Sequence, residues 1–172
     1  FWLGNFFKQG MDFDQEGNLY LADSGESQIE VFSNELKPLR HFGSIGSQAD
    51  QFQLLMDLKV SQDQVFALDY TLASVKVFHL DGTFQYEFST QAPEDEFSSC
   101  PSGLAVSNHK HVFVMDLRNG LKMFDLKGEF IKYIDLFSEF NLNSESEHYE
   151  RIQDLKTDDK GNLYLLFNFG GD

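Results

Sequence analysis

Phenylalanines recur at an interval of 46 residues, and this repeat constrains the fold more than any other feature of the sequence. Phe32, Phe78 and Phe124 each end a segment in which an apolar, a charged and another apolar residue come first. The three segments are Ile29-Glu30-Val31-Phe32, Val75-Lys76-Val77-Phe78 and Leu121-Lys122-Met123-Phe124. Self-similarity of this length is typical of folds built from adjoining copies of one small unit. The chain is therefore expected to be a repeat protein.

A second apolar segment lies upstream of each phenylalanine segment and ends in an aspartate, at Asp23, Asp69 and Asp116. Its residues are apolar on both faces, which predicts a strand that is covered on both sides. The aspartate is expected to accept backbone N–H bonds in the following turn. The phenylalanine segment alternates instead, so its central charged residue is expected to face water.

One further strand is predicted before these two and one after them, with turns at Glu16-Gly17-Asn18, Asp81-Gly82 and Lys127-Gly128. Four antiparallel strands per unit match the blade of a β-propeller. The expected fold class is all-β, with about three and a half blades in a single partial propeller domain, residues 1–172. The predicted blades cover about 8–52, 53–98, 99–150 and, for the half blade, 151–172. Residues 141–151 depart from the period and are predicted to form a surface loop.

The composition excludes some partners. The formal net charge is −15, from 28 acidic and 13 basic residues, which disfavours binding to nucleic acid or to anionic lipid. No stretch has the length of apolar residues that a membrane span needs. Cys100 is the single cysteine, so no intrachain disulfide is possible. The opening residues do not form a signal peptide; the compartment stays open, with an extracytoplasmic one slightly favoured.

Residues 17–25, GNLYLADSG, together with IEVF at 29–32 and HFGSIG at 41–46, resemble the NHL repeat. The resemblance spans Gly10 to Phe167 and is weaker in the later units, where Asp69-Tyr70-Thr71 and Asp116-Leu117-Arg118 replace Asp23-Ser24-Gly25. It implies a ring of usually six blades, which needs roughly 280 residues. The chain is therefore expected to be completed by further blades or by another chain.

The same resemblance implies a non-catalytic binding or scaffolding module that recognises a protein, peptide or carbohydrate through rim loops. A protein or peptide is the favoured partner, and no cofactor is expected. In a propeller, the loops that join the second strand of a blade to the third lie on one rim. The candidate binding residues in these loops are Ser24, Gly25, Glu26, Tyr70, Thr71, Leu117 and Arg118.

Two other functions remain open. The first is a metal-dependent propeller hydrolase or lyase, with calcium or zinc held over the central channel. Asp57 and Asp154 lie at the entrances of innermost strands, where the other two repeats have Gln9 and Ser102. The second alternative is a structural subunit of a larger assembly.

Two other metal-binding patterns are weak. Asp12-x-Asp14-x-Glu16-Gly17 resembles a calcium-binding loop, but such a loop needs flanking helices and these residues are predicted in strands and a turn. His109 and His111 could hold zinc only if further ligands approached. No serine, histidine and aspartate pattern of a hydrolase is evident.

Overall fold

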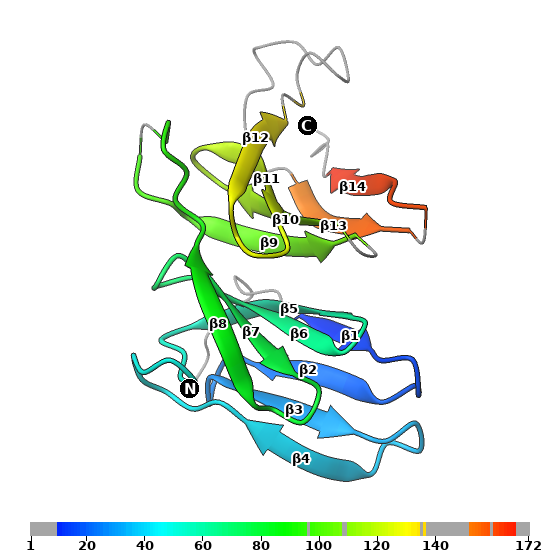
Figure 1. Ribbon diagram of the computed structural model, residues 1–172. Coiled ribbons are helices and arrows are strands. Elements are labelled where there is room, and N and C mark those ends of the chain that lie inside the picture. The colour runs from blue at the N-terminus through cyan, green and yellow to red at the C-terminus, as the bar shows by residue number, and fades with distance from the viewer. Residues whose placement is uncertain are drawn as a thin grey trace, which may run out of the picture. The chain divides into compact units, whose positions relative to one another are not determined.

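A computed structural model describes residues 10–95, 97–107, 110–134, 136, 152–158 and 160–167 (Figure 1). The first sheet contains β1 (Met11–Phe13), β2 (Leu19–Asp23), β3 (Gln28–Phe32) and β4 (Pro38–Phe42). The second contains β5 (Leu55–Ser61), β6 (Gln64–Asp69), β7 (Ser74–His79) and β8 (Phe84–Ser89). The third contains β9 (Pro101–Val106), β10 (His111–Asp116), β11 (Gly120–Asp125) and β12 (Phe130–Ile134). A two-stranded fourth sheet contains β13 (Ile152–Thr157) and β14 (Leu163–Phe167).

Each sheet is antiparallel, and its strands pair in the order in which they follow along the chain. The prediction of an all-β chain with four-stranded repeating units is therefore confirmed. The surface loop predicted at 141–151 lies outside the described residues. Within the described ranges, no helix is long and apolar enough to cross a membrane.

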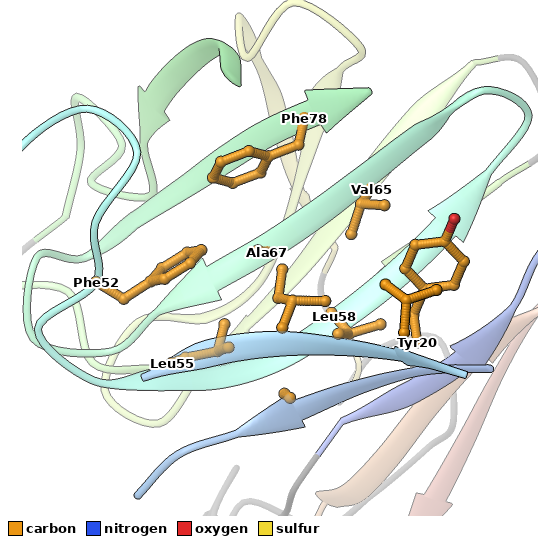
Figure 2. Close-up of a cluster of buried hydrophobic side chains, with 10 residues drawn as sticks. Tyr20, Phe52, Leu55, Leu58, Val65, Ala67 and Phe78 are labelled. Carbon is orange, nitrogen blue, oxygen red and sulfur yellow. The ribbon is translucent and has the colours of Figure 1, made fainter. Parts of the chain in front are cut away.

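The chain folds into two compact units, Phe1–Glu87 and Phe88–Asp172. In the first unit, β1 and β2 pack against β5, so two sheets share one core. Figure 2 shows this core, in which Tyr20, Leu58 and Val65 gather between the sheets and Phe78 lies beside Phe52. All five of these side chains are inaccessible to solvent. The second unit repeats the arrangement, since β9 packs against β13 and Ala105 shares a buried cluster with Ile152 and Leu155.

The recurring phenylalanines explain the period. The ring of Phe78 lies 5.3 Å from that of Phe42 and 5.7 Å from that of Phe84, and Phe124 lies 5.7 Å from Phe88. Tilted ring pairs at such distances add to the free energy gained by burial. The turn glycines predicted beside them adopt positive φ, 94° at Gly82 and 87° at Gly128, which only glycine does without strain.

Two of the three strands predicted to be covered on both faces are covered, whereas β2 alternates, with Leu19 and Leu21 only half-buried. From Val65 to Asp69, every residue of β6 is buried, and the same holds from Val112 to Asp116 in β10. The terminal aspartates also behave as predicted. Asp23 accepts the N–H groups of Gly25 and Glu26, Asp69 accepts that of Leu72, and Asp116 accepts those of Arg118 and Asn119.

One prediction about the strands that end in phenylalanine is wrong. The central lysines of β7 and β11 do not face water, because Lys76 is 1% exposed and Lys122 is fully buried. The ammonium of Lys122 lies 2.6 Å from Asp95 Oδ2 and 2.9 Å from Asp116 Oδ2, and it donates to the carbonyl oxygen of Thr90. Loop carboxylates and carbonyls therefore cover a strand face that alternation alone assigns to solvent.

Candidate functional site

The first strand of each sheet has one edge without a strand partner, and acidic and basic side chains cover this edge in the first unit. On β5, the N–H of Leu58 donates to Asp57 Oδ1 at 2.8 Å, and the ammonium of Lys59 donates to the Leu58 carbonyl at 3.1 Å. The N–H of Val60 donates to Oδ2 of Asp12, which comes from β1. We call Asp12, Asp57 and Lys59 the edge cluster.

The edge cluster holds its charges close together and largely away from water. Lys59 Nζ lies 3.0 Å from Asp57 Oδ1, and the exposed fractions of the two side chains are 11% and 1%. Burial lowers the effective dielectric constant, which strengthens the interaction of such a pair with a bound molecule. A carboxylate can remove a proton from a substrate, and an ammonium can stabilise a developing negative charge on oxygen. The pair can therefore support acid–base chemistry.

A β-bulge sets the direction of the Asp57 side chain. The register shifts between Leu55 and Asp57, so Met56 is the extra residue. The fourth sheet has the same irregularity between Ile152 and Asp154. There the N–H of the next residue, Leu155, again donates to the aspartate, at 2.8 Å from Asp154 Oδ1. Each unit thus contains one aspartate fixed in the same way at the start of a first strand.

The strand register corrects one sequence prediction. Asp57 pairs with Leu68, Asp154 pairs with Leu166, and the residue that pairs with the equivalent Met115 is Gly103. Ser102 is the extra residue of a bulge, so it does not occupy the place of the aspartates. In the first sheet, the carbonyl of Gly10 accepts the N–H of Ala22, which makes Gly10 the equivalent residue. The predicted Gln9 lies outside the described residues.

The two glycines leave space for the neighbouring first strand. A Cβ atom on Gly10 would lie 2.3 Å from Asp57 Oδ1 and 2.4 Å from the backbone nitrogen of Leu58. A Cβ atom on Gly103 would lie 2.7 Å from the Cδ2 methyl of Leu155. Within each unit, a glycine of one first strand therefore faces the Asp-Leu pair of the other.

A divalent cation does not fit the edge cluster as it stands. Asp57 Oδ1 already receives the ammonium of Lys59, and both oxygens of Asp12 accept backbone N–H groups. Among the residues described, no three or more histidine, cysteine, aspartate or glutamate side chains gather as metal ligands. Asp14 caps the β1–β2 turn through the N–H groups of Glu16 and Asn18. His111 lies in β10, and His109 lies outside the described residues.

The candidate rim residues lie in equivalent turns. Ser24, Gly25 and Glu26 are in the β2–β3 turn, Tyr70 and Thr71 in the β6–β7 turn, and Leu117 and Arg118 in the β10–β11 turn. Gly25, Glu26, Thr71 and Arg118 are exposed, whereas Ser24, Tyr70 and Leu117 are half-buried. Their role in binding stays a prediction.

Sequence reasoning identified Asp57, considered Asp12 only as part of a calcium-loop pattern, and missed Lys59. A signal for Lys59 was present, because Asp-Leu-Lys occurs at 57–59 and again at 154–156, at the starts of two first strands. Residues two apart on a strand share a face, so the carboxylate and the ammonium of each copy belong together. Lys156 of the second copy is exposed, unlike Lys59.

The chain resembles solved β-propellers. Virginiamycin B lyase from Staphylococcus aureus superposes with a TM-score of 0.65 at 13% identity, over 93% of this chain and 48% of that one. A catalytically inactive variant of that lyase with quinupristin gives 0.65 at 14%, over 93% and 48%. Glutaminyl cyclase from Myxococcus xanthus gives 0.66 at 13%, over 96% and 70%. No protein-family model and no curated protein matches the sequence.

These similarities establish the fold: the chain is a β-propeller array of about three and a half blades, as predicted, and it spans about half the length of the lyase. They also correct the leading functional prediction. A non-catalytic binding or scaffolding module is wrong as the first choice, since the similar propellers are a lyase and a cyclase.

Proposed function

We propose that this chain supplies blades to a β-propeller hydrolase or lyase whose active site lies over the central channel. The observation that carries the proposal is the aspartate at the bulge of a first strand, Asp57 in one unit and Asp154 in the other. Each carboxylate is held by the N–H of the following residue, at 2.8 Å in both cases. In this proposal, the fixed carboxylate at the entrance of an innermost strand is the group that meets the substrate at the channel mouth.

The chemistry of the site follows from its groups. Both hydrolysis and elimination need a base that takes a proton and a donor that stabilises negative charge on oxygen. Asp57 is the base of this proposal, and Lys59 is the donor. An ammonium has three N–H donors, and two of those of Lys59 bind Asp57 and the Leu58 carbonyl.

A calcium ion at Asp154 remains a separate proposal, and none of the proposed chemistry uses a metal ion. At Asp57, a divalent cation would have to displace the ammonium of Lys59.

We also propose that the propeller is of the NHL type and that further blades complete its ring. The GNLYLADSG segment at 17–25 supports the first point. Exposed apolar side chains on β1 and β14 support the second point, that further blades complete the ring. The exposed fractions are 57% for Met11 and 56% for Phe13 in β1, and 56% for Tyr164 and 57% for Leu166 in β14.

The test compounds are chosen from the lyase structure that contains quinupristin and from the name of the glutaminyl cyclase. The protein is incubated with quinupristin and, separately, with a peptide that begins with glutamine, and products are followed by mass spectrometry. We expect turnover of one of them, reduced about 100-fold or more by Asp57→Asn. The exposed Asp50→Asn is the matched control and should retain full activity. Turnover that survives both Asp57→Asn and Asp154→Asn would contradict the assignment of the site.

A further inference from the structure

The positive charge of the edge cluster comes from a side chain of the protein, the ammonium of Lys59. Lys59 is the basic member of a repeated Asp-Leu-Lys segment, its side chain is 11% exposed, and its ammonium contacts Asp57 Oδ1 at 3.0 Å. Asp12, from the neighbouring first strand, places a second carboxylate on the same pair of strand edges, through Phe13 N–H and Val60 N–H.

We infer that Lys59 takes the place of a metal ion in the first unit, so that the site at Asp57 works with a lysine ammonium and without calcium. The inference deepens the proposed function and rests on it for the meaning of the site, although its test needs no catalysis. A divalent cation at an acidic propeller entrance would neutralise carboxylates and polarise a substrate oxygen. Here the Lys59 ammonium does both. It carries a single positive charge, and its N–H groups point at defined acceptors.

The packing explains why the ammonium stays in position. Its second bond is to the carbonyl of Leu58, whose N–H is bound by Asp57, so the two side chains cover both polar groups of one residue at the strand edge. Withdrawing Lys59 would take an ammonium away from a carboxylate that is 1% exposed and a donor away from the Leu58 carbonyl at the strand edge. Such a site is strongly destabilised unless another cation enters it.

The response of the protein to calcium tests the inference. The thermal unfolding midpoint of the full chain is measured after dialysis against a chelator and again in millimolar calcium chloride. For the native sequence, we expect the same midpoint in both. For Lys59→Met, we expect a midpoint roughly 5–10 °C lower in chelator, and recovery of at least half of that loss in calcium.

Two further variants make the response specific. In the double variant Asp57→Asn, Lys59→Met, the calcium response should disappear, because the carboxylate that would bind the ion is gone. Lys37→Met removes an exposed lysine that pairs with Glu35, and it should change neither the midpoint nor the calcium response. If Lys59→Met does not fold, Lys59→Arg keeps a cation in place and should remain indifferent to calcium.

Three results would overturn the inference. One is a stoichiometric calcium ion in the dialysed native protein that is lost in Asp57→Asn. The others are a Lys59→Met midpoint equal to that of the native chain, and a Lys59→Arg variant stabilised by calcium. Because no substrate is present, these outcomes are independent of whether quinupristin or the glutamine peptide turns over.

Discussion

Gly10 and Gly103 occupy equivalent places, yet the atoms that face them differ in how far they can move. A Cβ on Gly10 would meet the backbone nitrogen of Leu58 at 2.4 Å, whereas a Cβ on Gly103 would meet the end of the Leu155 side chain at 2.7 Å. A leucine methyl can rotate away, but the backbone of a paired strand cannot. Space at Gly10 is therefore the stricter requirement.

We predict that Gly10→Ala lowers the free energy of unfolding by about 3 kcal/mol and Gly103→Ala by about 1 kcal/mol. Urea unfolding of the two variants, followed by circular dichroism, measures the difference. Gly25→Ala, in an exposed turn, serves as the reference. Equal losses at the two buried glycines would contradict this account of the packing.

The buried lysine of β11 gives a second prediction. Lys122 and its two carboxylate partners are shielded from solvent, and the hydroxyl of Tyr133 donates to Asp95 Oδ1 at 2.7 Å. Burial and the Asp95 carboxylate raise the pKa of Tyr133, so this hydroxyl remains a donor at neutral pH. Lys122→Met would leave two buried carboxylates without their counter-charge and should cost about 3–5 kcal/mol in chemical unfolding. The exposed Lys132→Met should cost close to nothing.

Acid should weaken the same region. Burial opposes the ionisation of Asp116, but hydrogen bonds from Ser99, the Arg118 N–H and Lys122 outweigh it, so the pKa of Asp116 lies below its ordinary value. A carboxyl with a lowered folded-state pKa stabilises the fold above the pKa of the unfolded chain, and that contribution is lost as the pH falls through the folded-state value.

We therefore predict that the unfolding midpoint in urea falls as the pH drops from about 5 to about 3, and that Asp116→Asn shows a smaller fall over this range. Asp50→Asn, which changes an exposed carboxyl, should fall like the native chain. An Asp116→Asn curve parallel to that of the native chain would show that other carboxyls govern the acid response.

These residues show what the sequence could and could not predict. The turn-capping role of Asp23, Asp69 and Asp116 was predictable, because an aspartate at the end of a strand bonds within its own turn. The burial of Lys122 was not, because its partner Asp95 is 27 residues away in an irregular loop. Contacts of the first kind are local, and contacts of the second kind depend on how a loop folds back over a strand.

At the scale of elements, the edge of β5 that has no strand partner is hydrogen-bonded by a side chain from another sheet. The Val60 N–H donates across the sheets to Asp12 Oδ2 at 2.9 Å, whereas the Leu58 N–H donates to Asp57 of the same strand. A hydrogen bond to a charged acceptor contributes about 1.5–3 kcal/mol. The two amides should therefore respond differently to changes in β1.

We predict that Asp12→Ala accelerates hydrogen exchange at the Val60 amide by about 10-fold or more and leaves the Leu58 amide within a factor of a few. Exchange followed by NMR resolves both sites. Asp63→Ala, at an exposed position between β5 and β6, is the control. Unchanged exchange at Val60 would mean that Asp12 does not hold this edge.

The elements themselves were predictable from the period, whereas the bulges in them were not. The spacing of Phe32, Phe78 and Phe124 places four strands in each complete unit, as observed. The bulges at Met56 and Ser102 add one residue to a strand without any change in the spacing of the apolar residues. Gly103 lies one 46-residue period after Asp57, and the two bulges fall at the same place in β5 and β9, so the period itself marks Gly103 as the equivalent residue and the assignment of Ser102 did not follow it.

At the scale of the whole molecule, the fourth sheet repeats the surface that the first sheet buries. Tyr164 donates to Asp158 and Tyr20 contacts Asp14 in equivalent turns. Tyr20 and Ala22 are inaccessible to solvent beside β5, whereas Tyr164 and its neighbour Leu166 are more than half exposed. The exposed face therefore has the composition of a blade interface.

We predict that the 172-residue chain alone has an apparent mass above 19.8 kDa in solution and that Tyr164→Lys with Leu166→Lys shifts it toward that value. Sedimentation or light scattering gives the mass. Ile131→Lys, which changes an exposed apolar residue of β12, should leave the association unchanged. A native chain that is a monomer at all concentrations would contradict a role for this face.

The glycine that faces an Asp-Leu pair also has a consequence for how such a sequence can change over time. Residue 10 must stay glycine whatever stands at 57, because a side chain there would meet the backbone of the neighbouring strand as well as the carboxylate. The constraint at 103 is weaker, because only the end of the Leu155 side chain lies close, so residues 103 and 155 can change together. We expect descendants of this sequence to keep glycine at 10, and to accept a small side chain at 103 where residue 155 becomes smaller.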